Sequence, residues 1–266
     1  NVIKKDTLFE NLPKKIKCAG RSISEYDLDI PSSLTAEEIL IRSGNIGSIK
    51  IAQKVGLENY KNFLDDLDLL NKTQFDIEEV GNPIPFKWGK CKLATSAYGH
   101  GITTTPLQLA KAYAIIANGG YKIKPTLIKR NKILKRGEQI ISEENSKKIN
   151  YILRKIVTSK QGTANLANIV GYEIGGKTGT AQKSIKGKYS KKKINTFASI
   201  FPISDPKYVL IVLLDEPKLS ETYVYNYNDG KVRKIVGTPF NTAGWTSVEV
   251  AKNIIEKIGP ILAIKY

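Results

Sequence analysis

Gly175-Gly-Lys-Thr-Gly-Thr-Ala-Gln182 is the stretch that decides the fold of this 266-residue chain. It falls at the end of a predicted strand, 169–181, and two more short runs of β-branched and aromatic residues, 196–203 and 208–214, follow it. The Lys- and Gly-rich residues 186–193 are expected to connect the first two strands. A lysine and two hydroxyls on a sheet edge can hold a carboxylate, and small residues let a substrate backbone lie alongside as an added strand. Taken alone, Lys-Thr-Gly also fits an ordinary surface strand.

Helical patterns occupy most of the chain before these strands, and one more follows them. The two clearest starts are Thr35, a capping residue followed by two glutamates, and Thr105-Pro106, where proline takes the first turn. The residues 1–33 and 71–101 are expected to be irregular. The helices are expected over about 34–42, 46–55, 58–70, 105–116, 142–158 and 246–258.

This order of elements predicts a mixed α and β fold with an antiparallel sheet flanked by helices. We expect a single domain over residues 1–266, shortened at its start. Its helical part would cover about 34–160, and its sheet and C-terminal helix about 168–260.

The formal net charge of the chain is +17, but this charge alone does not indicate that the protein binds nucleic acid. Only six of the 42 basic residues are arginine, the residue preferred for bidentate recognition of phosphates and bases. A dedicated nucleic-acid reader is therefore disfavoured. A lysine-rich coding genome explains the charge, and so does an anionic partner such as lipid headgroups or a wall polymer.

Few residues are available for metal or histidine chemistry. His100 is the only histidine, so neither a catalytic zinc site nor a Ser-His-Asp triad is expected, and any acyl transfer must use lysine as its base. We expect no cofactor. Cys18 and Cys91 are too few for a disulfide framework, and whether they pair is left open by the sequence.

A second short motif, Ser43-Gly44-Asn45, lies between two predicted helices. Alone it fits an inter-helix turn. An S-x-N that precedes K-T-G, however, belongs to the motif set of penicillin-binding proteins and serine β-lactamases.

Four segments then resemble class B penicillin-binding proteins, in the order that this family has. Ser96 to Tyr113 (SAYGHGITTTPLQLAKAY) is similar to the family's GxG…TPLQLA segment. Arg42-Ser-Gly-Asn-Ile-Gly47 resembles its S-S-N-x-G, and Gly176-Lys-Thr-Gly-Thr-Ala-Gln182 its GKTGTA strand. Leu213-Leu-Asp-Glu-Pro217 looks like the end of the following strand pair in the septal, cell-division members. The resemblance implies the serine β-lactamase/transpeptidase-like fold.

One family motif, the S-x-x-K that carries the nucleophile and opens a buried helix, should precede S-x-N. The two S-x-x-K strings in this chain, Ser190-Lys-Lys-Lys193 and Ser204-Asp-Pro-Lys207, both follow it. The first falls in the predicted basic connection and the second in a turn. We therefore expect the nucleophile to lie upstream of Asn1, together with any membrane anchor.

The resemblance also implies roles for three catalytic residues. Ser43 would lie on the proton path to the leaving nitrogen, between the upstream lysine and Lys177. Asn45 would hydrogen-bond the side-chain amide of the substrate.

Three neighbours of Lys177 would bind the substrate. Thr178 and Thr180 would hold its terminal carboxylate, with Lys177 adding positive field. The backbone N–H of Thr180 would form half of the oxyanion hole, and Gly179 would keep the strand edge open.

As a whole, the resemblance implies a peptidoglycan D,D-transpeptidase that cross-links stem peptides in septal wall synthesis and is acylated by β-lactams. Stem peptides, β-lactams and divisome membrane proteins would be its partners, at the periplasmic face of the inner membrane. An elongation-type transpeptidase, a non-catalytic β-lactam sensor or divisome scaffold, and a β-lactamase are the alternatives.

Overall fold

The structure is a computed structural model that describes residues 3–77, 81, 83–129, 136–185, 188–228 and 232–264. It forms two compact units. The first takes the chain up to Ile115 together with Gly120–Ser142, and the second takes Ile116–Gly119 together with the chain from Glu143 onward. In the part of the chain that the structure describes, no helix is long and apolar enough to cross a bilayer.

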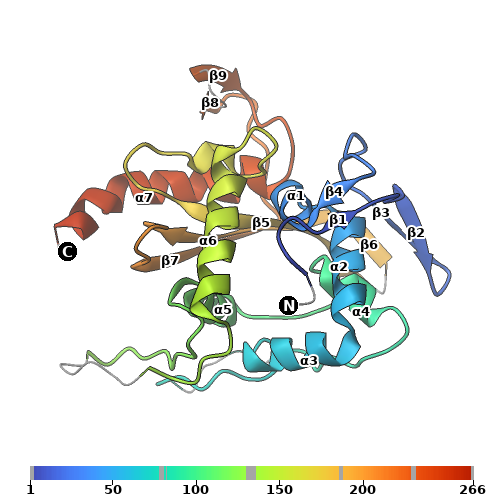
Figure 1. Ribbon diagram of the computed structural model, residues 1–266. Helices are drawn as coiled ribbons and strands as arrows, with labels where there is room; N and C mark the ends of the chain where they lie inside the picture. The colour runs from blue at the N-terminus through green and yellow to red at the C-terminus, as the bar shows by residue number, and fades with distance from the viewer. Residues whose placement is uncertain are drawn as a thin grey trace. The chain divides into compact units, whose positions relative to one another are not determined.

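Helices and short strands make up the regular structure of the first unit (Figure 1). The prediction that residues 1–33 are irregular was wrong in part, because three short strands form there. Strand β2 pairs with β3, and β1 pairs with β4, which follows residue 33. A helix within the expected loop 71–101 was also missed. The elements are β1 Leu8–Phe9, β2 Lys15–Cys18, β3 Arg21–Ser24, β4 Leu34–Thr35, α1 Ala36–Arg42, α2 Asn45–Val55, α3 Leu57–Asp66, α4 Lys92–Ala97 and α5 Pro106–Ala117.

The predicted helix starts are confirmed at the level of single hydrogen bonds. The Thr35 hydroxyl accepts from the backbone N–H of Glu38, whose carboxylate accepts from the Thr35 N–H, so the pair forms a capping box. The same reciprocal arrangement opens α5. The Gln108 backbone N–H donates to the Thr105 hydroxyl over 3.2 Å, and the Thr105 N–H donates to the Gln108 side-chain oxygen over 2.8 Å. The end of α3 was overestimated, since the helix stops at Asp66 rather than near 70.

A disulfide joins Cys18 in the β2–β3 hairpin to Cys91, next to α4. Their Cα atoms lie 5.8 Å apart, and 73 positions of sequence separate them. The question that the sequence left open is thereby answered. The cross-link encloses α1, α2 and α3 in one covalent loop, whose core is built on Ile39, Ile46 and Ile49, each 1% exposed or less.

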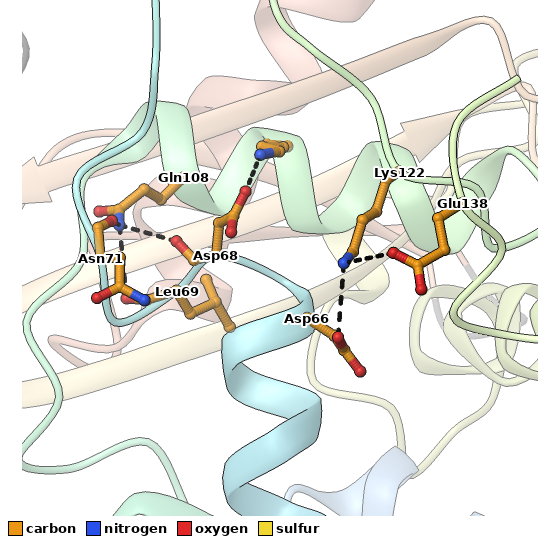
Figure 2. A network of polar contacts seen from close by, with 8 residues as sticks. Asp66, Asp68, Leu69, Asn71, Gln108, Lys122 and Glu138 are labelled. Carbon is orange, nitrogen blue, oxygen red and sulfur yellow. Dashed lines mark hydrogen bonds and ion pairs between the residues drawn. The ribbon is translucent and has the colours of Figure 1, made fainter. Parts of the chain in front are cut away.

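Gln108 is only 1% exposed and ties α5 to the turn after α3 (Figure 2). Its amide nitrogen donates to the backbone carbonyls of Asp68, at 3.0 Å, and Asn71, at 2.6 Å. Lys111, one turn along α5, pairs with the Asp68 carboxylate. The buried amide of the glutamine thus finds its acceptors in the backbone of the turn after α3.

Replacing Gln108 with alanine is expected to lower the free energy of unfolding by about 1–3 kcal/mol, because the turn after α3 loses its hydrogen bonds to α5 and a buried side chain is truncated. Urea unfolding of the purified chain measures the loss. Gln53→Ala, an exposed glutamine on α2, is the matched control and should change stability by less than about 0.5 kcal/mol. Equal effects of the two substitutions would contradict this role of Gln108.

A three-stranded antiparallel sheet in the order β5-β6-β7 is the centre of the second unit. Helix α6 packs along β5, and α7 packs against β6 and β7 (Figure 1). A separate hairpin, β8–β9, follows β7. The elements are α6 Glu143–Thr158, β5 Gly175–Ile185, β6 Lys188–Phe201, β7 Tyr208–Asp215, β8 Val224–Asn228, β9 Val232–Val236 and α7 Ser247–Ala263.

The predictions for this unit were right in type and order, but several boundaries were wrong. Strand β5 begins at Gly175, not 169, because a 3₁₀ turn over Asn165–Ala167 and a loop come first. The predicted basic connection is wrong for 188–193, where the chain is already in β6. The backbone of residues 188–193 pairs with β5 in a long hairpin. Main-chain hydrogen bonds hold this pairing, so the strand forms without the apolar alternation that would have predicted it. The β8–β9 hairpin was missed.

Candidate active site

The Lys-Thr-Gly motif lies on β5, the edge strand of the three-stranded sheet. Lys177 lies opposite Ala198 of β6, and Thr180 lies opposite Asn195. Gly176 is needed for this packing, since a Cβ at that position would lie 2.7 Å from the Phe197 ring and 2.6 Å from the Ala198 carbonyl oxygen. Gly179 and Thr180 are exposed. Within the residues that the structure describes, the outer edge of β5 has no strand partner.

Both threonine hydroxyls of the motif are oriented by neighbouring groups. The Thr180 hydroxyl oxygen accepts from the backbone N–H of Ala243 over 2.9 Å, which leaves its proton available for an incoming acceptor. The Thr178 and Thr163 hydroxyls lie 2.6 Å apart and share one hydrogen bond. Neither partner, Ala243 or Thr163, carries a sequence signal, so both were missed.

Asn195 fixes the segment that supplies the Ala243 N–H. This side chain is fully buried, and its amide nitrogen donates to Asn241 and to Thr246, at 2.9 Å each. The start of α7 is therefore tied to the strand that pairs with the Lys-Thr-Gly edge.

Lys177 is half-buried as a residue, and its ammonium group donates to the carbonyl oxygen of Thr178 over 2.9 Å. Burial disfavours its charged form and lowers the pKa of Lys177 to about 8. The side chain therefore titrates just above neutral pH, where a group that binds a carboxylate or relays a proton is useful.

In the first unit, Ser43 and Asn45 lie on the turn between α1 and α2. Ser43 ends α1 in the left-handed region at φ 58°, an uncommon conformation for a residue with a side chain. Asn45 begins α2, and its amide nitrogen donates to the carbonyl oxygen of Ser24 over 2.9 Å. Gly47 lets the helices approach, because a Cβ there would lie 2.6 Å from the Ile39 side chain. The predicted site residues thus form two groups, one in each unit.

The remaining sequence features do not add a catalytic group. Ser190 lies within strand β6, and Ser204 lies in the turn before β7, where it bonds Glu173, so neither begins a helix. His100 packs against Tyr98, with ring centroids 4.7 Å apart, and burial lowers its pKa. Among the described residues, no group of three or more His, Cys, Asp or Glu side chains is placed to hold a metal ion.

The family model of the penicillin binding protein transpeptidase domain matches residues 1–241. The chain belongs to this family. A solved structure, the transpeptidase domain of penicillin-binding protein 3 from Burkholderia pseudomallei, superposes with a TM-score of 0.77 at 25% identity, over 96% of this chain and 73% of that one. The predicted transpeptidase-like fold is therefore confirmed.

Two curated relatives agree with the family assignment. The probable peptidoglycan D,D-transpeptidase FtsI of Caulobacter vibrioides is 29% identical over 260 residues, which cover 94% of this chain and 41% of that protein. Stage V sporulation protein D of Bacillus subtilis is 35% identical over 198 residues, which cover 68% of this chain and 30% of that protein. The chain spans less than half the length of either relative.

Proposed function

We propose that the protein containing this chain is a peptidoglycan D,D-transpeptidase that is acylated by β-lactams. The observation that carries the proposal is the edge of β5, where a lysine with a lowered pKa lies beside two oriented threonine hydroxyls. An extended peptide that ends in a carboxylate can add to such an edge through main-chain hydrogen bonds. The names of the relatives support the same reaction.

In this reaction a serine attacks the penultimate D-Ala carbonyl of a stem peptide, and the terminal D-Ala leaves. We assign Thr178 and Thr180 to the terminal carboxylate, because the Thr180 hydroxyl has a proton to donate. The N–H of Thr180 forms half of the oxyanion hole, and Gly179 leaves room for the substrate backbone. Lys177 adds positive field at the carboxylate.

Two residues of the first unit are proposed for further roles in this reaction. Ser43 relays a proton toward the leaving nitrogen, together with Lys177 and the lysine of the nucleophile motif. Asn45 hydrogen-bonds the side-chain amide of the stem peptide.

Septal wall synthesis is the proposed setting. The sequence Asp215-Glu-Pro217, which begins at the last residue of β7, and the FtsI-type relative favour septal synthesis over elongation. Under this proposal the protein acts at the periplasmic face of the inner membrane beside divisome membrane proteins, held by a segment that precedes this chain. The disulfide supports such an oxidising compartment.

The acylated serine, we propose, is not one of the serines in these 266 residues, because neither S-x-x-K string begins a helix. Incubation with a fluorescent penicillin followed by denaturing electrophoresis tests this. The 266-residue chain should remain unlabelled, and the natural protein that contains it should be labelled. Labelling of the 266-residue chain would contradict the assignment of the nucleophile. A natural protein that resists labelling would favour the non-catalytic scaffold.

A further inference from the structure

The backbone of the S-x-N turn is held by a carboxylate from a distant part of the chain. Glu25, which follows β3, is only 8% exposed. One of its carboxylate oxygens accepts from the Asn45 N–H over 2.7 Å, and the other accepts from the Ile46 N–H over 2.8 Å. Both oxygens are thus engaged by the first two residues of α2.

This contact replaces a cap that α2 does not have. The N-cap residue is Gly44, which offers no side chain to the free N–H groups of the first turn. A Cβ on Gly44 would lie 2.9 Å from the end of the Ile30 side chain, which would have to shift to make room. Glu25 therefore supplies the acceptor, and its negative charge lies at the positive end of the helix dipole.

The segment around Glu25 also holds both flanks of Ser43. On one side, the Asp27 carboxylate pairs with Arg42 at 3.0 Å. On the other, the Ser24 carbonyl oxygen accepts from the Asn45 side chain at 2.9 Å. With Arg42 and Asn45 fixed, the Ser43 backbone is held in its left-handed conformation. Such a conformation persists where surrounding contacts determine it, often at functional sites.

We propose that Glu25 is a positioning residue for Ser43 and Asn45. It acts through the backbone of α2 and does not itself touch the substrate. Its carboxylate accepts two backbone N–H groups at once, so it sets the direction of the Asn45 side chain and the place of the Ser43 hydroxyl. This role rests on the proposed transpeptidase function, and no short sequence motif marks it.

The test compares Glu25→Gln and Glu25→Asp with the wild type in the full-length protein. Glutamine keeps the shape of the side chain, but its amide nitrogen would face an N–H donor, so only one of the two bonds can form. Aspartate keeps the charge and both acceptors on a shorter stem. The expected second-order rate constants for acylation by a fluorescent penicillin are about tenfold lower for glutamine and two- to fourfold lower for aspartate.

Two readouts separate positioning from a purely structural role. The rate constant is measured on folded protein, and the total labelled fraction at saturation is measured beside it. A residue needed only for folding would lower the labelled fraction and leave the rate constant unchanged. Glu10→Gln, the same substitution at an exposed site of the first unit, is the matched control and should change neither quantity.

The outcomes are distinct. A Glu25→Gln rate constant equal to that of Glu10→Gln overturns the role of Glu25. If the glutamine variant does not fold, the aspartate variant decides, and a rate constant equal to the wild type overturns the role. Wild-type protein that is not labelled overturns the proposed function, and this inference with it.

Discussion

Replacing Lys177 with alanine in the full-length protein is expected to slow acylation by a labelled penicillin by about a hundredfold. The substitution removes the positive charge beside the two threonine hydroxyls and one member of the proposed proton path. Stopped-time labelling gives the second-order rate constant. The variant should remain folded. The Lys177 ammonium donates to the carbonyl of the next residue, Thr178, while main-chain pairing with β6 holds strand β5 in the sheet.

Lys183→Ala is the matched control, because Lys183 lies on the same strand and pairs instead with Asp215 and Glu216 at its surface. Surface pairs of this kind contribute little to stability. The control should therefore keep its acylation rate within about twofold of the wild type. An unchanged rate for Lys177→Ala would remove Lys177 from the proposed site.

The pH dependence of acylation tests the same residue by its charge. Burial lowers the pKa of Lys177 to about 8, so the side chain is protonated below that pH and loses its charge above it. If the charge attracts the substrate carboxylate, the rate constant should fall as pH rises through about 8. Arginine keeps its charge above pH 12. In Lys177→Arg the alkaline decline should therefore move upward, and a decline that stays at pH 8 would assign it to another group.

The features that the sequence predicted correctly are those that depend on neighbouring residues. Thr35 and Thr105 were predicted as capping residues, and the structure confirms both. Helix α6 begins with Glu143, as its acidic first turn predicts. The order of helices and strands follows from such local signals and from the period of the apolar residues.

The contacts that shape the candidate site are not local, and the sequence did not reveal them. Glu25 and Asn45 are 20 positions apart, and the Asn195–Thr246 bond spans 51. An isolated glutamate after a short strand is typical of a solvated turn, so only the tertiary fold shows that it is buried. The hairpin over 188–193 was missed because its lysines give no apolar alternation, although its backbone pairs regularly.

Breaking the disulfide between Cys18 and Cys91 is expected to lower the free energy of unfolding of the first unit by about 2–4 kcal/mol. The cross-link joins residues 73 positions apart and therefore restricts the unfolded chain strongly. Urea unfolding with and without a reducing agent measures the loss, and thiol titration confirms that the bond has opened. The double variant Cys18→Ser, Cys91→Ser should match the reduced wild type and show no further response to reductant.

The same bond has a smaller expected effect on the site than on stability. The β2–β3 hairpin that carries Cys18 leads directly to Ser24 and Glu25, but these residues are also held by their own bonds to Asn45 and Ile46. Full-length protein that is reduced but still folded should therefore be acylated at nearly the same rate as the oxidised protein. Equal urea midpoints for the oxidised and reduced forms would show that the cross-link does not stabilise the first unit. A large fall in acylation rate without unfolding would mean instead that the disulfide, rather than the Glu25 contacts, holds the S-x-N turn.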